Sequence, residues 1–322
     1  MTLHGIRQQQ NDLLKHEGKI MKAVVCTKYG PPEGLQLREV EKPLPKDDEI
    51  LVKIHATTVT SGDVILRTLK FPLRLVFRFF FGLGKNKILG HELAGEIEST
   101  GKNVTRFKPG DQVFASAGSK GGAYAEFISL PENGMVATKP ENISFEEAAA
   151  VPVGGNTALY ILRDGDIQEG HSVLIYGASG SVGTYAVQLA SNFGGQVTGV
   201  CSTSNIEMVK SLGAKKVIDY TREDVFQTGE TYDVIFDAVR KTSPSSWKSS
   251  LSKDGTFLSV SAPTKERTEN LNYLKELIEA GEIKVVIDRS YSLNQIPDAH
   301  RYVEKGHKKG NVVIQVVTDD KI

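Results

Sequence analysis

The sequence predicts an α/β protein in two parts, a β-rich part and a doubly wound parallel-sheet part with helices on both faces. Between residues 21 and 138, short apolar runs alternate with Gly, Pro and charged residues, as is typical of strands joined by turns. From residue 172 onward, strand-like and helix-like stretches alternate, which indicates parallel strands joined by crossover helices. A glycine-rich stretch at residues 177–183 stands between the first of these strands and the first of these helices.

The strands of the first part are predicted from apolar runs that turn residues interrupt. They cover residues 22–26, 35–40, 49–57, 93–99, 112–115 and 123–130. Residues 1–20 are polar and lack the long apolar core of a signal peptide. We therefore expect a leader, either a frayed, disordered extension or a short helix packed on the body.

The second part opens with a predicted helix from Glu146, a Pro-Gly break, and a second helix from near Asn156 to Arg163. The strands that follow are predicted at residues 173–176, 197–200, 216–218, 234–236 and 256–260, and the helices at 182–193, 206–212, 243–251 and 270–280. The tail returns to strands at 285–287 and 311–317, with a helix at 296–305, and we expect it to fold back onto the first part. This predicts a leader (1–20), one domain of residues 21–145 plus 285–322, and a second domain of residues 146–284.

The glycine-rich stretch favours nucleotide binding. A buried strand precedes it, a helix follows it, and a second strand comes next. Glycines allow a sharp turn and a close approach of the backbone to a ligand, while a helix start offers free N–H groups to a diphosphate. The alternative is a tight strand–helix turn without a ligand. The candidate cofactor-binding residues here are Gly177, Ala178, Ser179, Gly180, Ser181, Val182 and Gly183.

The composition is that of an ordinary folded protein of 322 residues, with 39% apolar and 24% charged residues. Lys and Arg together number 39, as do Asp and Glu, and this balance argues against nucleic acid as a partner. The two cysteines, Cys26 and Cys201, give no disulfide framework, which fits a reducing compartment, and we expect the cytoplasm. No apolar run reaches the ~18 residues that a transmembrane helix needs.

Residues 71–83 read FPLRLVFRFFFGL. They could form an amphipathic segment on a membrane surface. Because no other membrane feature occurs, we favour an aromatic lining of a pocket or an oligomer interface.

Three motifs carry a resemblance to a known family. They are Gly90-His91-Glu92-x-x-Gly95, Gly110-Asp111-x-Val113 and Ala178-Ser179-Gly180-x-Val182-Gly183. In this order they resemble the medium-chain dehydrogenase/reductase superfamily, and most closely its zinc-free quinone oxidoreductase branch, over about residues 21–317. The resemblance implies a GroES-like β-rich domain and a Rossmann cofactor-binding domain, in agreement with the strand pattern.

The zinc-dependent members of that superfamily hold a catalytic ion with a histidine and two cysteines, donors that zinc prefers. By the resemblance, His91 keeps the histidine position, while Thr60 and Val153 stand where the cysteines would be. The four clustered cysteines of the structural zinc are also missing. We expect no metal, and His91 and Glu92 as buried structural or interface residues; a zinc alcohol dehydrogenase is the alternative.

NADPH is the predicted cofactor, ahead of NADH. An acid at the end of the second strand would bind the ribose 2′-OH of NAD, but this strand is followed by Ser202, Thr203, Ser204 and Asn205. Their hydroxyl and amide groups can donate to a 2′-phosphate. Relatives often carry Lys or Arg near Ser204, so Lys210 or Arg222 would have to supply the charge.

Other cofactor contacts are implied by position or by the resemblance. Tyr220 resembles a tyrosine beside the adenine ribose phosphate, with a plain surface tyrosine as the alternative. At the nicotinamide end the candidates are Thr157, Val239, Val260, Ser261 and Asn311, each of which could serve packing instead.

Without zinc, hydrogen bonds would have to polarise the acceptor, which suits a small apolar quinone or an α,β-unsaturated carbonyl. Thr60 and Asp63 occupy the loop that faces the nicotinamide in relatives and are the candidate catalytic residues, Asp63 with a structural role as its alternative. No obligate acid or base is evident, and solvent could supply the proton. A homodimer through the edge of the parallel sheet is plausible, and a nucleotide-binding docking protein without turnover is the alternative function.

Overall fold

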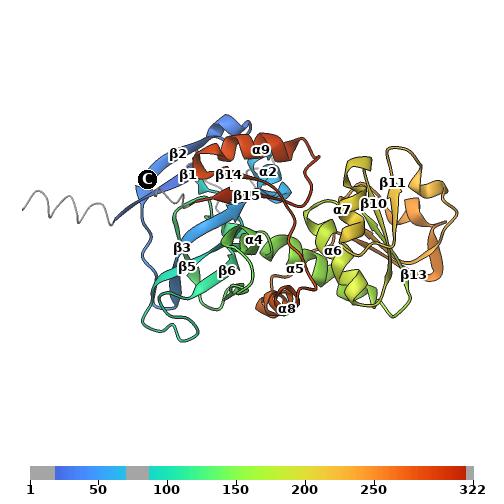
Figure 1. Cartoon of the computed structure of the whole chain (residues 1–322). Helices are drawn as coiled ribbons and strands as arrows, with labels where there is room; N and C mark the ends of the chain where they lie inside the picture. Colours follow the sequence, from blue (N-terminus) through green and yellow to red (C-terminus); the bar gives the residue numbers. More distant parts are fainter. Residues whose placement is uncertain (1–18, 70–86, 317–322) are drawn as a thin grey trace, which may run out of the picture.

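The computed structural model describes residues 19–69 and 87–316. Their helices and strands form two lobes joined by a helical middle (Figure 1). The first lobe holds two sheets, with strand orders β2-β1-β4 and β14-β15-β3-β5-β6-β8, and β7 pairs with β3 beside the second. The second lobe holds one five-stranded sheet of order β11-β10-β9-β12-β13.

The first lobe is built from strands with apolar residues on their inner face. In chain order they are β1 (Ile20–Cys26), β2 (Leu35–Glu41), β3 (Glu49–Thr58), β4 (Lys87–Ile88), β5 (Glu92–Thr100), β6 (Gln112–Ser116), β7 (Phe127–Pro131), β8 (Val136–Thr138), β14 (Ile287–Ser292) and β15 (Asn311–Gln315). The tail enters this lobe because β15 pairs antiparallel with β3, Val313 opposite Thr58, and parallel with β14.

Two helices of the first lobe, α2 (Ser61–Thr68) and α9 (Ile296–Glu304), are joined by a buried arginine. Arg67 donates from Nη2 to Glu304 Oε2 at 2.9 Å and from Nε to His300 Nδ1 at 3.3 Å. Burial lowers the pKa of His300 to about 4, so this imidazole is neutral and can accept that bond. The bonds fix α2, which carries Asp63, against the tail.

The second lobe alternates strands and helices. Its elements are β9 (Ser172–Tyr176), α6 (Ser181–Asn192), β10 (Gln196–Cys201), α7 (Ile206–Ser211), β11 (Lys216–Asp219), β12 (Tyr232–Asp237) and β13 (Leu251–Ser259). Every neighbouring pair of strands is parallel. The predicted fold class, a GroES-like β-rich part plus a Rossmann-like parallel sheet, is confirmed.

Three helices lie between the lobes: α4 (Phe145–Ala149), α5 (Pro152–Leu162) and α8 (Thr268–Glu279) (Figure 1). One apolar cluster runs from Ala94 and Phe114 of the first lobe through Leu159 of α5 to Ile175 of the parallel sheet. The two lobes therefore share part of one core.

Several predicted boundaries are wrong, each for a local reason. The second helix begins at Pro152, because proline suits the first helical turn, where its missing N–H is not needed. The predicted helix at residues 243–251 is only a 3₁₀ turn, Pro244–Trp247, because Trp247 is buried against the sheet and the chain enters β13 at Leu251. The strand predicted at 123–130 begins only at Phe127.

At the chain ends, Ile20 belongs to β1 although it was placed in the leader, and the strand predicted at 285–287 begins only at Ile287. The rest of the leader up to residue 18, and residues 71–83, lie outside the described residues. Within residues 19–69 and 87–316, no helix combines the length and apolar character that crossing a bilayer requires.

Candidate cofactor and substrate site

The carboxyl ends of the parallel strands meet along one edge of the sheet. The register pairs Tyr176 with Val200 and Asp237, Cys201 with Asp219, and Asp237 with Ser259. Ligands of open α/β sheets bind at this edge, next to the point where the strand order reverses. Here the order reverses at β9, whose neighbours are β10 and β12.

The turn from β9 to α6 shows why glycine is needed at two of its three positions. Gly177 has φ of +83°, a left-handed conformation that side chains rarely adopt. At Gly183 a Cβ atom would lie 2.1 Å from the Gly177 carbonyl oxygen, so the start of α6 packs directly on the turn. Gly180 differs, because a Cβ there would meet nothing closer than 3.6 Å. The backbone at Gly180 therefore has open space beside it.

The tail closes one side of this turn. Gly310 N–H donates to the Ser179 carbonyl at 2.8 Å, and Ser181 Oγ donates to Asn311 Oδ1 at 2.6 Å. Asn311 Nδ2 in turn donates to the Val286 carbonyl at 3.1 Å. Ser181 and Asn311, both candidate cofactor residues, are thus in direct contact across the junction of the lobes.

The loop after β10 holds its own polar side chains together. Ser202 Oγ lies 3.4 Å from Ser204 Oγ and accepts from Asn205 Nδ2 at 3.2 Å. Thr203 donates through Oγ1 to the carboxylate of Asp219, at the end of the next strand.

Asp219 also accepts from the Thr221 hydroxyl at 2.6 Å and lies 3.5 Å from Arg222 Nε. The bonds from Thr203 and Thr221 hold the pKa of Asp219 below its usual range. Asp219 was not among the predicted site residues, because it ends the third strand in chain order, β11, rather than the second, β10. It could have been found from its place at the end of a predicted neighbouring strand.

The remaining cofactor candidates are dispersed. Val239 faces the turn, since its Cγ1 lies 2.4 Å from where a Cβ of Gly177 would be. Val260 and Ser261 follow β13 at the same sheet edge, where Arg240 Nε donates to the Val260 carbonyl at 3.1 Å.

Two candidates lie farther from these contacts. Thr157 is half-buried one turn after Gly154 on α5, where a Cβ of Gly154 would lie 2.6 Å from Ser181 Oγ. Tyr220 is 51% exposed beyond β11.

The two candidate catalytic residues open α2 of the first lobe. Thr60 caps the helix by accepting from Asp63 N–H at 3.1 Å, and Thr60 Oγ1 donates to Asp63 Oδ2 at 2.6 Å. The other oxygen, Asp63 Oδ1, lies 2.6 Å from His91 Nδ1. This histidine partner was not anticipated, because 28 residues separate it from Asp63 in the chain.

Asp63 and His91 form an ion pair when the imidazole is protonated. Burial alone would lower the pKa of His91, but the carboxylate raises it above its ordinary value. Burial would raise the pKa of Asp63, and the imidazolium lowers it. Asp63 is fully buried, while 21% of the His91 side chain is exposed, so the pair has one solvent-accessible end.

Glu92 joins the lobes from the position next to His91. Its Oε2 accepts from Val153 N–H at the start of α5, at 2.7 Å, and its Oε1 accepts from Thr58 Oγ1. Burial raises the pKa of this carboxyl to about 7. These contacts agree with the expected buried structural role of Glu92. The same role was expected of His91, but its side chain is partly exposed to solvent.

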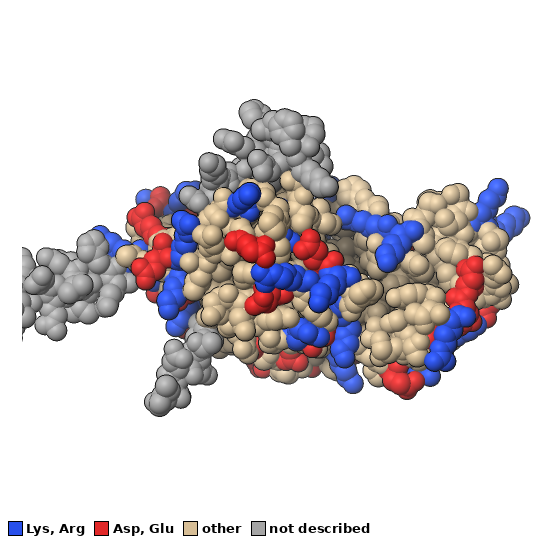
Figure 2. Space-filling view, turned by 90° about the horizontal axis from the view of Figure 1, so that it is seen from above, with Lys and Arg blue, Asp and Glu red and all other residues tan. Residues whose placement is uncertain are grey.

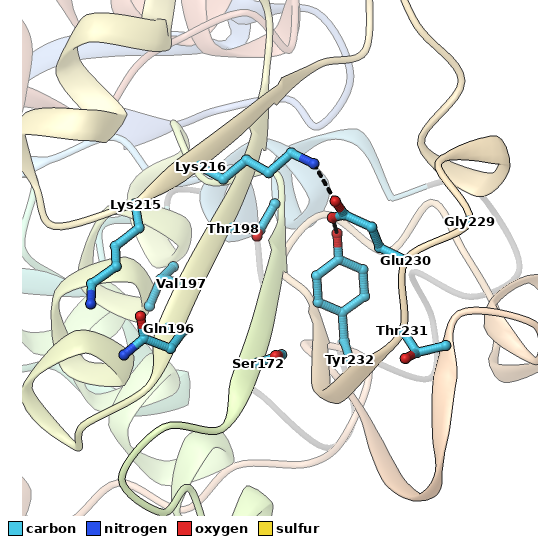
Figure 3. A pocket seen from close by; sticks show the side chains of 10 residues that line it. All are labelled: Ser172, Gln196, Val197, Thr198, Lys215, Lys216, Gly229, Glu230, Thr231 and Tyr232. Atoms are coloured by element: carbon cyan, nitrogen blue, oxygen red, sulfur yellow. Dashed lines mark hydrogen bonds and ion pairs between the residues drawn. The ribbon is translucent and has the colours of Figure 1, made fainter.

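A separate pocket of about 500 Å³ lies at the opposite, amino-terminal edge of the parallel sheet (Figure 3). Within it Lys216 Nζ is bonded to Glu230 Oε1 at 2.5 Å, and Tyr232 donates to Glu230 Oε2 at 2.8 Å. None of the candidate residues lines it. Figure 2 shows a hollow between the two lobes on one face, with Lys and Arg side chains beside it.

Comparison with known proteins agrees with this architecture. The alcohol dehydrogenase GroES-like domain model matches residues 46–141, and the zinc-binding dehydrogenase model matches residues 212–270 and 261–314. The chloroplastic quinone-oxidoreductase QR1 of Triphysaria versicolor is 32% identical, covering 92% of this chain and 99% of its own length. The chloroplastic NADPH-dependent alkenal/one oxidoreductase of Arabidopsis thaliana is 31% identical over 92% of this chain and 80% of its own.

Among solved structures, the quinone oxidoreductase from Coxiella burnetii superposes with a TM-score of 0.82 at 26% identity, covering 93% of this chain and 100% of that one. Fold, motifs and relatives agree, and the chain belongs to the medium-chain dehydrogenase/reductase superfamily, as an oxidoreductase of its quinone-oxidoreductase-like branch.

Proposed function

We propose that this protein reduces a small apolar quinone or α,β-unsaturated carbonyl by hydride transfer from NADPH, without zinc. The observation that carries the proposal is the turn at residues 177–183, whose open Gly180 faces the junction where the tail meets α6. The quinone and alkenal/one oxidoreductases among its relatives support the substrate class.

The residues at the sheet edge fit a dinucleotide. The amides at the start of α6 would hold the diphosphate, with Ser181 beside them, because helix N-termini attract anions. Val239 and Val260 offer apolar surface near the turn. The dinucleotide, when bound, supplies the hydride.

The loop after β10 supports NADPH over NADH. Ser202, Ser204 and Asn205 present hydroxyl and amide groups without a carboxylate of their own. Both candidate cations have an acidic partner: Lys210 lies 3.2 Å from Glu207, and Arg222 lies 3.5 Å from Asp219, which also accepts from Thr203 of the loop. We assign the charge that meets the 2′-phosphate to Arg222, whose side chain is 75% exposed.

Zinc independence is supported by the donor chemistry around His91. Of the two positions where zinc-dependent members carry cysteines, one is Thr60, whose hydroxyl is bonded to Asp63. The other is Val153, whose side chain has no donor atom for a metal. His91 Nδ1 is bonded to a carboxylate. These two positions supply no thiolate, and among residues 19–69 and 87–316 no group of three or more His, Cys, Asp or Glu side chains could hold a metal ion together.

We assign the proton of the reduction to His91. Asp63 holds Nδ1, so Nε2 is the ring nitrogen that can face the substrate. Hydride arrival at the β-carbon of an enone moves an electron pair onto the carbonyl oxygen. The His91 imidazolium protonates the resulting enolate, and solvent returns the proton to His91. Thr60 orients Asp63 and is a positioning residue in this scheme.

An absorbance assay at the nicotinamide band tests the function, with NADPH and NADH each offered to quinones, enones, saturated ketones and alcohols. We expect NADPH oxidation with quinones and enones, retained after exhaustive chelation and in metal-free buffer. Tight NADPH binding with no acceptor reduced would favour a docking protein instead. Activity restored only by zinc would favour an alcohol dehydrogenase.

Cytoplasmic location and a homodimer complete the proposal. The named relatives include chloroplastic proteins, so fractionation of cells expressing the full chain is the direct test of location. Edge strand β13 is the surface we propose for dimer contact, and sedimentation measures the assembly.

A further inference from the structure

A partly buried lysine lies beside the glycine turn, and neither the motifs nor the site described above account for it. Lys308 stands in the loop between α9 and β15, and its Nζ donates to the Gly310 carbonyl at 2.6 Å. Gly310 is the residue whose N–H bonds Ser179, and it also forms a β-bridge with Gly180. The ammonium is therefore held one residue from the turn.

The position of Gly310 is fixed from both sides. Its φ is +53°, and a Cβ there would lie 2.3 Å from the Val286 carbonyl oxygen. Next to it, Asn311 bonds both Ser181 and Val286. Because this backbone cannot move away from α6, Lys308 is anchored to the turn through the carbonyl that it contacts.

The ammonium has no carboxylate partner among residues 19–69 and 87–316. Two carboxyl groups act electrostatically on the ammonium, those of Glu92 and Asp288. Both have other partners, since Glu92 accepts from Val153 and Thr58, and Asp288 accepts from the Tyr302 hydroxyl at 2.6 Å. Burial lowers the pKa of Lys308 to about 8 although both acids oppose this. A desolvated cation bonded to a single neutral carbonyl is stabilised when an anion arrives.

We infer that Lys308 binds the diphosphate of the dinucleotide, opposite the amides at the start of α6. The inference rests on the proposed function and adds a residue to it. The helix offers N–H dipoles but no charged side chain in its first turn, and Lys308 supplies a positive charge from the tail loop whose Gly310 bonds Ser179 of the turn. As both dinucleotides contain the diphosphate, Lys308 strengthens binding without choosing between NADPH and NADH.

The test compares Lys308→Met and Lys308→Arg with Lys309→Met, a control that removes the neighbouring exposed ammonium. Dissociation constants for NADPH and NADH are measured by nicotinamide fluorescence, with inorganic pyrophosphate as a competitor. We expect Lys308→Met to raise the dissociation constants of both dinucleotides about 10- to 100-fold, and that of pyrophosphate to a similar degree. Lys308→Arg retains most of the affinity, and Lys309→Met matches the wild type.

Salt dependence separates a charge contact from a structural role. Loss of one phosphate contact reduces the slope of log Kd against log salt, and we expect this in Lys308→Met with an unchanged melting temperature. Three results would overturn the inference: unchanged binding in Lys308→Met, equal losses in the Met and Arg variants with lower melting temperatures, or a loss restricted to NADPH. A wild-type protein that binds neither dinucleotide would instead refute the proposed function, and the inference with it.

Discussion

Two glycines three residues apart in the same turn should respond in opposite ways to an added methyl group. In Gly183→Ala the new Cβ would lie 2.1 Å from the Gly177 carbonyl oxygen and 2.9 Å from backbone atoms of Ala178. Neither neighbour is a side chain that can rotate away. In Gly180→Ala the nearest atom would be 3.6 Å away, and φ is already −79°. Only the first substitution is sterically excluded by the fold.

We therefore expect Gly183→Ala to destabilise the protein by about 1–3 kcal/mol, the usual cost of overpacking. For a domain of this size that corresponds to a drop in melting temperature of about 2–12 °C. Gly180→Ala should melt within about 2–4 °C of the wild type, because the loss of a preferred N-cap residue is largely offset by the smaller conformational entropy of alanine in the unfolded chain. Its Cβ would nevertheless occupy the space where the diphosphate approaches, and we expect at least about a tenfold loss of NADPH affinity.

Differential scanning calorimetry and fluorescence titration of the two variants form the assay. If Gly180→Ala binds NADPH as the wild type does, the turn does not hold the diphosphate. If Gly183→Ala is as stable as the wild type, the packing of α6 on the turn is looser than described. A loss of stability in both variants would contradict the steric difference between them.

Three further predictions concern single side chains. Asp63→Asn should lower the pKa of His91, and enone reduction needs the imidazolium, so the pH above which activity declines should shift downward. At neutral pH we expect kcat to be about 10- to 100-fold lower. A pH profile of kcat identical to that of the wild type would refute this. Glu92 has a pKa of about 7 in the folded state, above its ordinary 4.5, so the folded state binds the extra proton and its contribution to stability falls as pH rises between these values. The free energy of unfolding of Glu92→Gln, measured with urea, should gain on that of the wild type as pH rises across this window and keep a constant difference above it. A difference that does not depend on pH would show that Glu92 does not titrate in this window. Arg222→Ala should raise the Kd of NADPH about tenfold and leave that of NADH unchanged, with Lys210→Ala as the control; equal effects on both dinucleotides would exclude a contact with the 2′-phosphate.

The sequence was sufficient for the parts of the fold that periodicity and glycine spacing determine. The run from residue 173 to residue 200 predicts strand, turn, helix and strand, because buried parallel strands and the turn between them have a strong local pattern. It failed where tertiary contacts override local preference. Trp247 lies in a stretch with a helical appearance, yet its burial beside Phe226 and Tyr176 leaves room for only a short 3₁₀ turn.

The sequence names candidate site residues one at a time but does not predict the contacts among them. The capping pair Thr60 and Asp63 is three residues apart, so its local bond follows from a common helix-start pattern. The bonds from Asp63 to His91 and from Ser181 to Asn311 span 28 and 130 residues. Only the arrangement of the sheets brings such residues together, and a single sequence carries no pattern for it.

The apolar cluster that crosses from the first lobe into the second has a consequence for how ligands enter. A hinge between the lobes would have to pull Leu159 and its neighbours out of contact with Phe114, which exposes apolar surface to water, and would break the bond from Glu92 to Val153. Wide rotation of one lobe against the other is therefore costly. A ligand must therefore enter and leave while the shared interior of the two lobes stays closed to water.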